Sequence, residues 1–234
     1  MRPQRPVTLI VTCEHGGNRI PAAFATLFQD QQWLLSTHRG YDAGALEMGR
    51  AIARAFHADF FASTISRLCV EMNRTPGHPA FRSTIMRAAS APLQRAAQRY
   101  YDAHHARVKG RVAAAVASGE RVLHIASHSF TPRMNGENRR ADAGLLYDPK
   151  RRWESCFCAA WQTALREQAP QWVVRRNYPY RGDSDGLTND LRNLHSEASY
   201  CGIELEMNAR LVRAGPVLWT KARASVIAAL RALL

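Results

Sequence analysis

Two histidines in this chain stand beside polar residues at points where an apolar run ends. Glu14 and His15 directly follow the run VTLIVTC, and His128 lies between two serines at the end of the run RVLHIAS. Imidazole and carboxylate groups that converge can hold a catalytic zinc ion, which takes three protein ligands and leaves a fourth position for water. His15 and His128, together with one carboxylate, are therefore candidate metal ligands.

Further carboxylates and a third histidine occupy comparable positions. Asp42 follows His38 in the segment between the first apolar run and the next helical pattern, and Glu204 and Glu206 both lie in the run GIELEMN. Because alternate residues of a strand face the same side, the two glutamates share a face. His38 could orient a ligand rather than bind the metal itself. These residues complete the set from which a metal site could be built.

A third polar cluster offers groups that bind anions. The apolar residues of segment 66–74 alternate as in a strand, which would deliver Asn73 and Arg74 into a loop rich in proline and glycine. A guanidinium group binds a carboxylate through two parallel hydrogen bonds. Arg74 is therefore a candidate clamp for an acidic substrate.

The elements that must position these residues alternate between strand and helix, which is typical of a three-layer α/β domain. We expect strands at 7–13, 60–66, 121–127, 144–147, 172–175 and 203–207, and helices at 42–56, 91–117, 152–168 and 216–234. No repeat or linker interrupts this order, so we expect a single domain over residues 1–234. Ligands of open α/β sheets bind at the carboxyl ends of the strands. The long polar segments 74–90 and 129–142 are expected to form loops over that site.

Composition disfavours several classes of protein. The formal net charge is +13, but the arginines are spread along the chain without a nucleic-acid-binding motif. The charge therefore favours attraction of small anionic substrates over binding of nucleic acid. No apolar run reaches the length of a membrane span, and the first residues lack the pattern of a signal peptide, so a cytoplasmic protein without a membrane segment is expected. The five cysteines lack zinc-finger spacing and are expected to be reduced thiols.

Six short motifs resemble, in order, those of the N-formylglutamate amidohydrolase family, and they span most of residues 7–210. They are CEHGGNRIP, STHRGYDAGA, SRLCVEMNRT, HIASHSF, NYPYRGDSDGL and GIELEMN. The family is similar to the zinc carboxypeptidases, and the resemblance implies a phosphorylase/hydrolase-like α/β/α fold with a mixed central sheet. It also implies cleavage of N-formyl-L-glutamate, or a related small acidic N-acyl amino acid, to formate and glutamate.

The resemblance further implies that His15 and His128 hold one divalent metal ion, with zinc preferred. The carboxypeptidase pattern H-x-x-E would put a glutamate where this chain has Asn18, which is a poor zinc ligand. That departure makes Asp42 the first choice for the third ligand and Glu14 the second.

The remaining roles also come from the resemblance. Glu206 resembles the catalytic glutamate of the family, although Ala209 stands where an arginine often follows the motif. Asn73 and Arg74 resemble the pair with which zinc carboxypeptidases bind a terminal carboxylate, and Arg181 is a second candidate for an anion contact.

Two other functions compete with this interpretation. A metallopeptidase or deacylase of the same superfamily would use the same zinc and the same glutamate on a different N-acyl substrate. A basic nucleic-acid-binding protein would instead depend on the arginine clusters, and its binding would weaken steeply with salt and need no metal.

Overall fold

A mixed six-stranded sheet forms the centre of the computed structural model, which describes residues 6–234. The strands are β1 (Val7–Cys13), β2 (Asp59–Ala62), β3 (Arg121–Phe130), β6 (Ala143–Leu146), β7 (Val174–Arg176) and β8 (Tyr200–Asn208), and their order is β2-β1-β3-β8-β6-β7. Neighbours from β2 to β8 are parallel, whereas β6 is antiparallel to β8. The expected mixed sheet is therefore confirmed.

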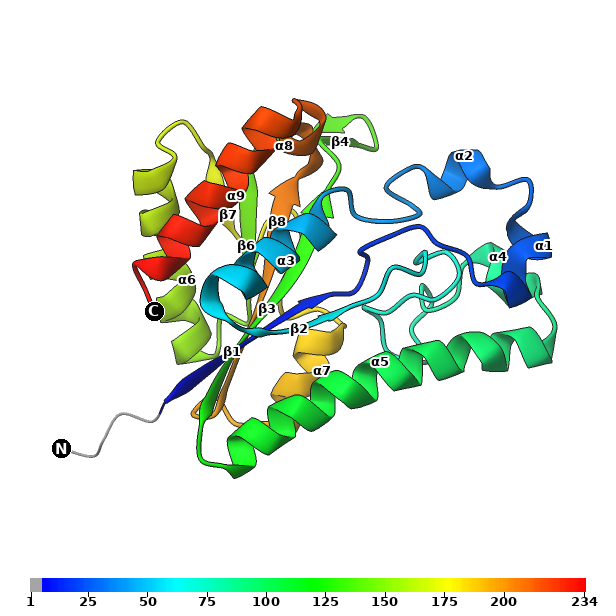
Figure 1. Cartoon of the computed structure of the whole chain (residues 1–234), viewed down its shortest axis with the longest axis horizontal. Helices are drawn as coiled ribbons and strands as arrows, with labels where there is room; N and C mark the ends of the chain where they lie inside the picture. The colour runs from blue at the N-terminus through cyan, green and yellow to red at the C-terminus, as the bar shows by residue number, and fades with distance from the viewer. Residues whose placement is uncertain (1–5) are drawn as a thin grey trace.

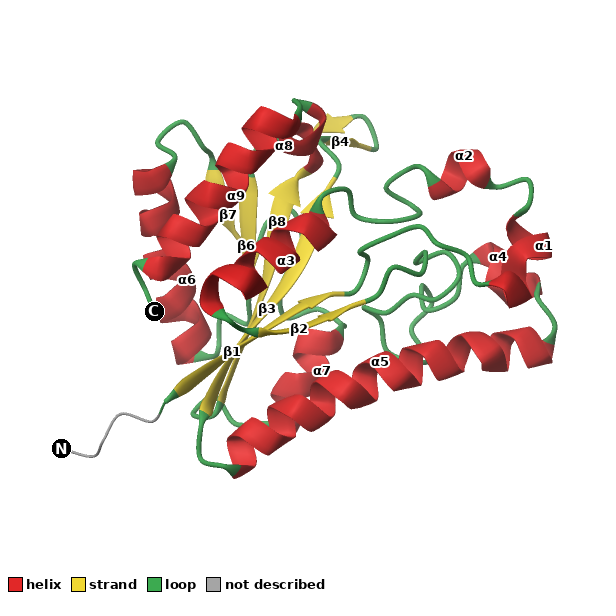
Figure 2. Cartoon of the chain, viewed as in Figure 1, coloured by secondary structure: helices red, strands yellow, loops and turns green. Residues whose placement is uncertain are grey.

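Helices cover both faces of this sheet (Figures 1 and 2). One face carries α3 (Ala45–Phe56), α6 (Arg152–Gln168) and α9 (Pro216–Arg231), and the other carries α5 (Ala91–Ala117) and α7 (Leu187–Leu194). Strand alternation divides the side chains between two cores: Leu123 of β3 packs with the first group of helices, and Val122 packs with the second. The three-layer α/β/α arrangement is confirmed.

A smaller region, which we call the lobe, consists of residues 20–41 and 63–101. It contains η1 (Ala22–Phe24), α1 (Ala25–Phe28), α2 (Gln32–Leu35) and α4 (Thr84–Ala88), and it encloses its own cluster of buried apolar side chains. Figure 1 shows these helices on the side of the molecule away from α6 and α9, with α5 running from the lobe to the sheet. The two ends of α5 accordingly pack in different cores, Tyr101 in the lobe and Val112 under the sheet.

The segment 66–74 is not the strand that its alternation predicts. Its first residues form a turn in which the amides of Cys69 and Val70 both donate to the carbonyl of Ser66. Leu68 and Met72 are buried along with these residues because the lobe core surrounds the segment. The alternation of apolar residues in this segment therefore reflects their burial in the lobe core, although the backbone is not an extended strand.

Other differences lie at the ends of elements and in short ones. The helices expected at 91–117 and 152–168 have those bounds, whereas the helix expected from residue 42 begins at Ala45, after Gly44 in a left-handed conformation (φ 80°). Of the strand expected at 60–66, only residues 60–62 are in a strand, namely β2. Our sequence-based expectations did not include α7, although Leu187, Leu191 and Leu194 have helical spacing. They also did not include α8 (Ala209–Arg213) or the hairpin of β4 (Arg133–Met134) and β5 (Glu137–Asn138). Among residues 6–234, none of the helices combines the length and apolar character needed to cross a bilayer.

Candidate functional site

The candidate site lies where β1, β3 and β8 end side by side. His128 of β3 is the register partner of Glu206 on β8, so both side chains leave the sheet at the same level. His15 follows the end of β1, and its carbonyl accepts the amide of Asp42 at 2.9 Å. That backbone bond fixes the segment leading into α3 against the end of β1, so four candidate residues meet in one place.

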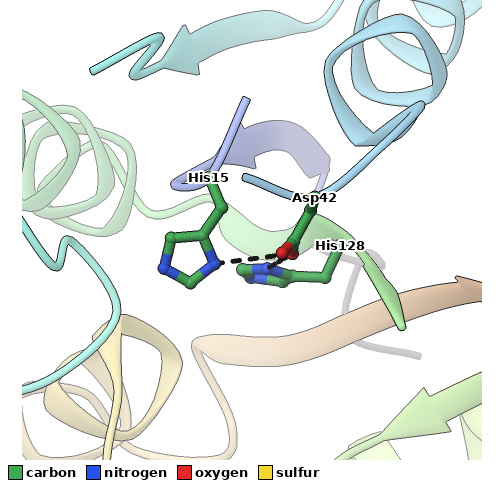
Figure 3. Close-up of side chains that lie close together, drawn as sticks. All are labelled: His15, Asp42 and His128. Carbon is green, nitrogen blue, oxygen red and sulfur yellow. Dashed lines mark hydrogen bonds and ion pairs between the residues drawn. The ribbon is translucent and has the colours of Figure 1, made fainter. Parts of the chain in front are cut away.

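His15, Asp42 and His128 converge within this site (Figure 3). Asp42 Oδ2 lies 3.0 Å from Nδ1 of His128 and 3.4 Å from Nδ1 of His15. One ligand atom from each of the three residues lies within 4.8 Å of the other two, and all three side chains are buried. The set that the sequence puts first for metal binding is therefore assembled, with Asp42 as its carboxylate.

The outer nitrogen of each histidine faces its own buried carboxylate. His15 Nε2 lies 2.5 Å from Oε1 of Glu71, and His128 Nε2 lies 3.1 Å from Oε2 of Glu14. Histidines that bind metals commonly present their second ring nitrogen to a carboxylate, which fixes the tautomer and the orientation of the ring. The inner nitrogen of His15 also has no hydrogen-bond partner among the described residues. This donor set fits a divalent metal ion.

The charges at the centre keep its carboxylates ionised. Arg67 reaches Oδ1 of Asp42 at 3.3 Å and Oε2 of Glu71 at 2.8 Å. Burial opposes ionisation, but His15, His128 and Arg67 together hold the pKa of Asp42 well below its usual range. Arg67 and His15 lower the pKa of Glu71 in the same way. Both groups are thus available as acceptors across the neutral pH range.

Glu206 behaves differently from these carboxylates. Burial raises the pKa of Glu206 to about 8; Asp42 and Glu204 reinforce the effect, and His128 only partly offsets it. Its Oε2 has no hydrogen-bond partner within residues 6–234. A carboxyl group with a pKa near neutrality can both accept and release a proton during turnover.

A cavity of about 320 Å³ joins these residues to the predicted anion-binding groups. Its lining includes His15, Asp42, Asn73, Arg74, His128, Arg181, Glu204 and Glu206. Arg74 donates to the carbonyl of Asp185 at 2.7 Å, which fixes the lobe against the loop before α7. Arg181 is 71% exposed and pairs with Asp183 at 2.7 Å, so it lies at the rim.

The other candidates take different places. Glu14, the second choice for the third ligand, is completely buried behind His128 and does not line the cavity. Glu204 lines the cavity and accepts the hydroxyl of Thr188 at 2.9 Å. His38 lines a neighbouring cavity. Asn73 accepts the amide of Leu187 through Oδ1 at 2.9 Å.

Sequence reasoning missed three residues around the centre. Arg67 and Glu71 stand in a quoted motif, yet the expected strand gave no reason to pair them with Asp42 and His15. His104 of α5 lies 3.6 Å from Oε1 of Glu14. The helical period, which puts His104 on the same buried face as Tyr101 and Val108, was the one signal that could have found it.

Comparisons with known proteins bear on the fold and the family of this chain. A structure of a gene product from Agrobacterium tumefaciens has a TM-score of 0.78 and 28% identity, covering 96% of this chain and 90% of that one. The N-formylglutamate amidohydrolase from Ralstonia eutropha JMP134 has a TM-score of 0.67 and 19% identity, covering 95% and 94%. A search of curated proteins found no match. The sequence profile of the N-formylglutamate amidohydrolases matches residues 7–213, so this chain belongs to that family of enzymes, which hydrolyse amide bonds.

Proposed function

We propose that this enzyme is a metal-dependent amidohydrolase that removes the acyl group from an acidic N-acyl amino acid. N-formyl-L-glutamate, which would yield formate and glutamate, is the reference substrate. The observation that carries the proposal is the buried cluster of His15, Asp42 and His128, in which a separate carboxylate backs each histidine. The cluster lies in one cavity with Glu206 and Arg74.

The proposed metal ligands are Nδ1 of His15, Nδ1 of His128 and a carboxylate oxygen of Asp42. A zinc or similar divalent ion supplies a positive charge that polarises an amide carbonyl and lowers the pKa of water. Glu71 orients the ring of His15 through a hydrogen bond to Nε2, and the Glu14 carboxylate lies 3.1 Å from Nε2 of His128, within ion-pair distance. The three ligands come from different segments, so the folded chain is needed to assemble them.

Glu206 carries the proton in this proposal. It takes a proton from the water that attacks the acyl carbon, and it gives a proton to the nitrogen of the departing amine as the C–N bond breaks. The raised pKa of Glu206, about 8, suits a group that must bind and release a proton near neutrality. Arg67 lines the same cavity and adds positive charge for the oxyanion that develops on the carbonyl oxygen.

Asn73, Arg74 and Arg181 hold the amino-acid end of the substrate. The Arg74 guanidinium is anchored by the carbonyls of Asn73 and Asp185, at 2.9 and 2.7 Å, so it is oriented before a ligand arrives. Preorganised donors lose less freedom when they bind a carboxylate. Arg181, at the exposed rim, supplies a weaker contact because solvent screens its charge.

Metal analysis combined with assays on N-formyl-L-glutamate tests this function. Purified protein is expected to bind about one divalent metal ion per chain, to lose activity on chelation and to regain it when zinc is restored. Glu206→Gln is expected to lower kcat by about 100- to 10,000-fold while the metal stays bound. Glu137→Gln, on the exposed β5, is the matched control. Activity that survives chelation, or full activity of Glu206→Gln, would contradict the proposal.

A further inference from the structure

A second and larger cavity lies next to the one already described. Its volume is about 690 Å³, and it shares Asp42, Arg67, Ser129 and Tyr180 with the first cavity. One wall is formed by lobe residues 79–87, and the opposite wall by the end of β3 and the hairpin residue Met134. Asp42, one of the three candidate metal ligands, therefore lines both cavities.

The proposed function places the amino-acid end of the amide substrate and leaves open where its acyl end lies. In the proposed function, Asn73 and Arg74 hold the amino-acid carboxylate in the first cavity, and the scissile carbonyl lies at Asp42. The remaining substituent of the carbonyl carbon then points into the second cavity. A formyl group has only hydrogen there, whereas each water in the liquid already takes about 30 Å³. A cavity of about 690 Å³ is far larger than formyl requires.

The second cavity is also rich in positive charge. Its lining includes His38, Arg39, Arg67, Arg82 and Arg87, and its acidic members are Asp42 and Glu71. Both carboxylates already pair with Arg67. Within residues 6–234, neither Arg39 nor Arg82 forms a salt bridge. The Arg82 guanidinium lies 5.2 Å from the centre of the Phe81 ring, a contact that leaves its positive charge without a carboxylate partner.

Two further side chains of this cavity are shaped by its positive charge and its hydrogen bonds. Arg87 donates to the carbonyls of Pro79 and Arg82, each at 3.0 Å, which orients its guanidinium without neutralising it. Burial together with Arg67 and Arg39 lowers the pKa of His38, as expected where positive charges gather. Leu68, Phe130 and Met134 add apolar surface for the methylene groups of a chain.

We propose that the second cavity binds the acyl group of the substrate and selects a long acyl chain that ends in an anion. The chemical class is the half-amide of a dicarboxylic acid, such as an N-succinyl, N-glutaryl or N-adipoyl amino acid. The apolar residues contact the methylene groups, and Arg82 and Arg39 bind the distal carboxylate. This inference rests on the proposed function, and it extends that function from the amino-acid end to the acyl end.

Kinetics on a graded set of substrates test the inference. The set consists of L-glutamate carrying formyl, succinyl, glutaryl or adipoyl groups, with the uncharged acyl group of equal carbon number beside each dicarboxylic one. At least one dicarboxylic substrate is expected to exceed both N-formyl-L-glutamate and its uncharged counterpart about tenfold in kcat/KM, the scale of one charge-assisted hydrogen bond. If the formyl substrate is the best, or the uncharged chains do equally well, the inference is wrong.

Variants locate the effect in the cavity. Arg82→Gln is expected to lower kcat/KM for the dicarboxylic substrate at least fivefold relative to its uncharged counterpart. It should leave hydrolysis of N-formyl-L-glutamate unchanged. Arg39→Gln is expected to act in the same direction. Arg95→Gln, exposed on α5 and outside both cavities, is the control and should match the wild type. A preference that persists in both Arg82→Gln and Arg39→Gln would overturn the inference.

Calorimetric binding separates this inference from the proposed function. The preferred dicarboxylic substrate is titrated into Glu206→Gln with and without Arg82→Gln. Binding that weakens with Arg82→Gln supports the cavity assignment even if the wild type hydrolyses no substrate, in which case the proposed function fails. If the wild type hydrolyses N-formyl-L-glutamate but Arg82→Gln does not change the affinity for the dicarboxylic substrate, the proposed function stands and the cavity assignment fails.

Discussion

The sheet and the lobe position their functional groups by different means. The β3–β8 ladder places His128 opposite Glu206, so hydrogen bonds along whole strands fix both side chains. In the lobe, Arg67 and Glu71 come from a segment without regular secondary structure. This segment is held in place by two hydrogen bonds to the carbonyl of Gly40, from the Ser66 hydroxyl at 2.9 Å and from the Arg67 amide at 3.1 Å. In the proposed function, the sheet thus supplies the catalytic groups, and the lobe supplies groups that orient them and contact the substrate. Specificity can change in the lobe without disturbing the ladder.

Asp42, which joins the two regions, gives the largest expected effect. Its Oδ1 faces Arg67 of the lobe. Its Oδ2 faces His15, which follows β1, and His128, which lies on β3. Asp42→Ala is expected to lose the bound metal and about 4 kcal/mol or more of transition-state stabilisation, roughly a thousandfold in rate. Metal analysis and kcat/KM on N-formyl-L-glutamate measure both losses. Retention of a full complement of metal would show that Asp42 is not a ligand.

The two cores should also differ in how they unfold. Phe24 is fully buried in the lobe core, whereas Trp161 is fully buried in the core beneath α6 and α9. Phe24→Ala is expected to cost about 3–5 kcal/mol and to speed amide hydrogen exchange mainly in the lobe, because the two clusters are separate. Trp161→Ala should instead speed exchange throughout the sheet. If both variants change exchange uniformly, the lobe does not open on its own.

Acid should weaken the sheet through one buried histidine. His124 lies 2.8 Å from the Thr12 hydroxyl and 2.7 Å from the Tyr200 hydroxyl, and burial lowers its pKa to about 4. Between about pH 6.5 and 4, the His124 imidazole is protonated in the unfolded chain but stays neutral in the folded chain. The free energy of unfolding therefore falls as pH falls through that window.

The size of this effect follows from the pKa shift. By itself, the His124 shift is expected to lower the free energy of unfolding by about 3 kcal/mol between neutral pH and pH 4, and His124→Gln should lack that component. Urea unfolding at several pH values measures the difference between the two proteins. Phe24→Ala is the control, because a lobe variant should keep the same pH dependence. Parallel curves for the wild type and His124→Gln would refute the assignment.

The smallest expected effect compares one carboxylate from each region. Glu14 follows β1 and backs His128, while Glu71 belongs to the lobe and backs His15. Either change to Gln is expected to weaken metal affinity about 10- to 100-fold. Glu71→Gln should also alter KM, because Arg67 loses one of its two ion-pair partners, whereas Glu14→Gln should leave KM unchanged once metal is saturating. Glu167→Gln, exposed on α6, is the control for both. Equal KM changes in the two variants would contradict this division of roles.

Sequence reasoning succeeded where a pattern runs through many residues. The bounds of α5 could be predicted because the segment is rich in alanine, has Pro92 in its first turn and ends just before Gly119. The helical pattern of residues 152–168 likewise predicted α6. The convergence of His15 and His128 followed from their positions after β1 and at the end of β3, and the family resemblance put Asp42 with them. The ligand candidates were therefore accessible before any coordinates.

The rest could not be predicted because it depends on contacts distant in sequence. Glu71 meets His15 across 56 residues, through a segment whose alternation reflects the lobe core rather than a strand. Glu14 stands next to His15 in the chain, yet it points to His128 and His104 instead of the candidate metal centre. His15 and Glu14 are neighbours in the sequence. The packing of β1, β3 and α5 is what makes His15 a candidate ligand and places the Glu14 carboxylate behind His128.

Because Asp42 bridges the lobe and the sheet, the proposed metal ion would connect these two regions. A metal that binds only the folded arrangement adds its binding free energy to stability, in proportion to the logarithm of its concentration over Kd. Since Asp42 holds Arg67 as well as the histidines, part of that energy resists separation of the lobe from the strand ends. Loading the metal would therefore also set the walls of both cavities, so an enzyme short of metal would lose substrate discrimination along with turnover.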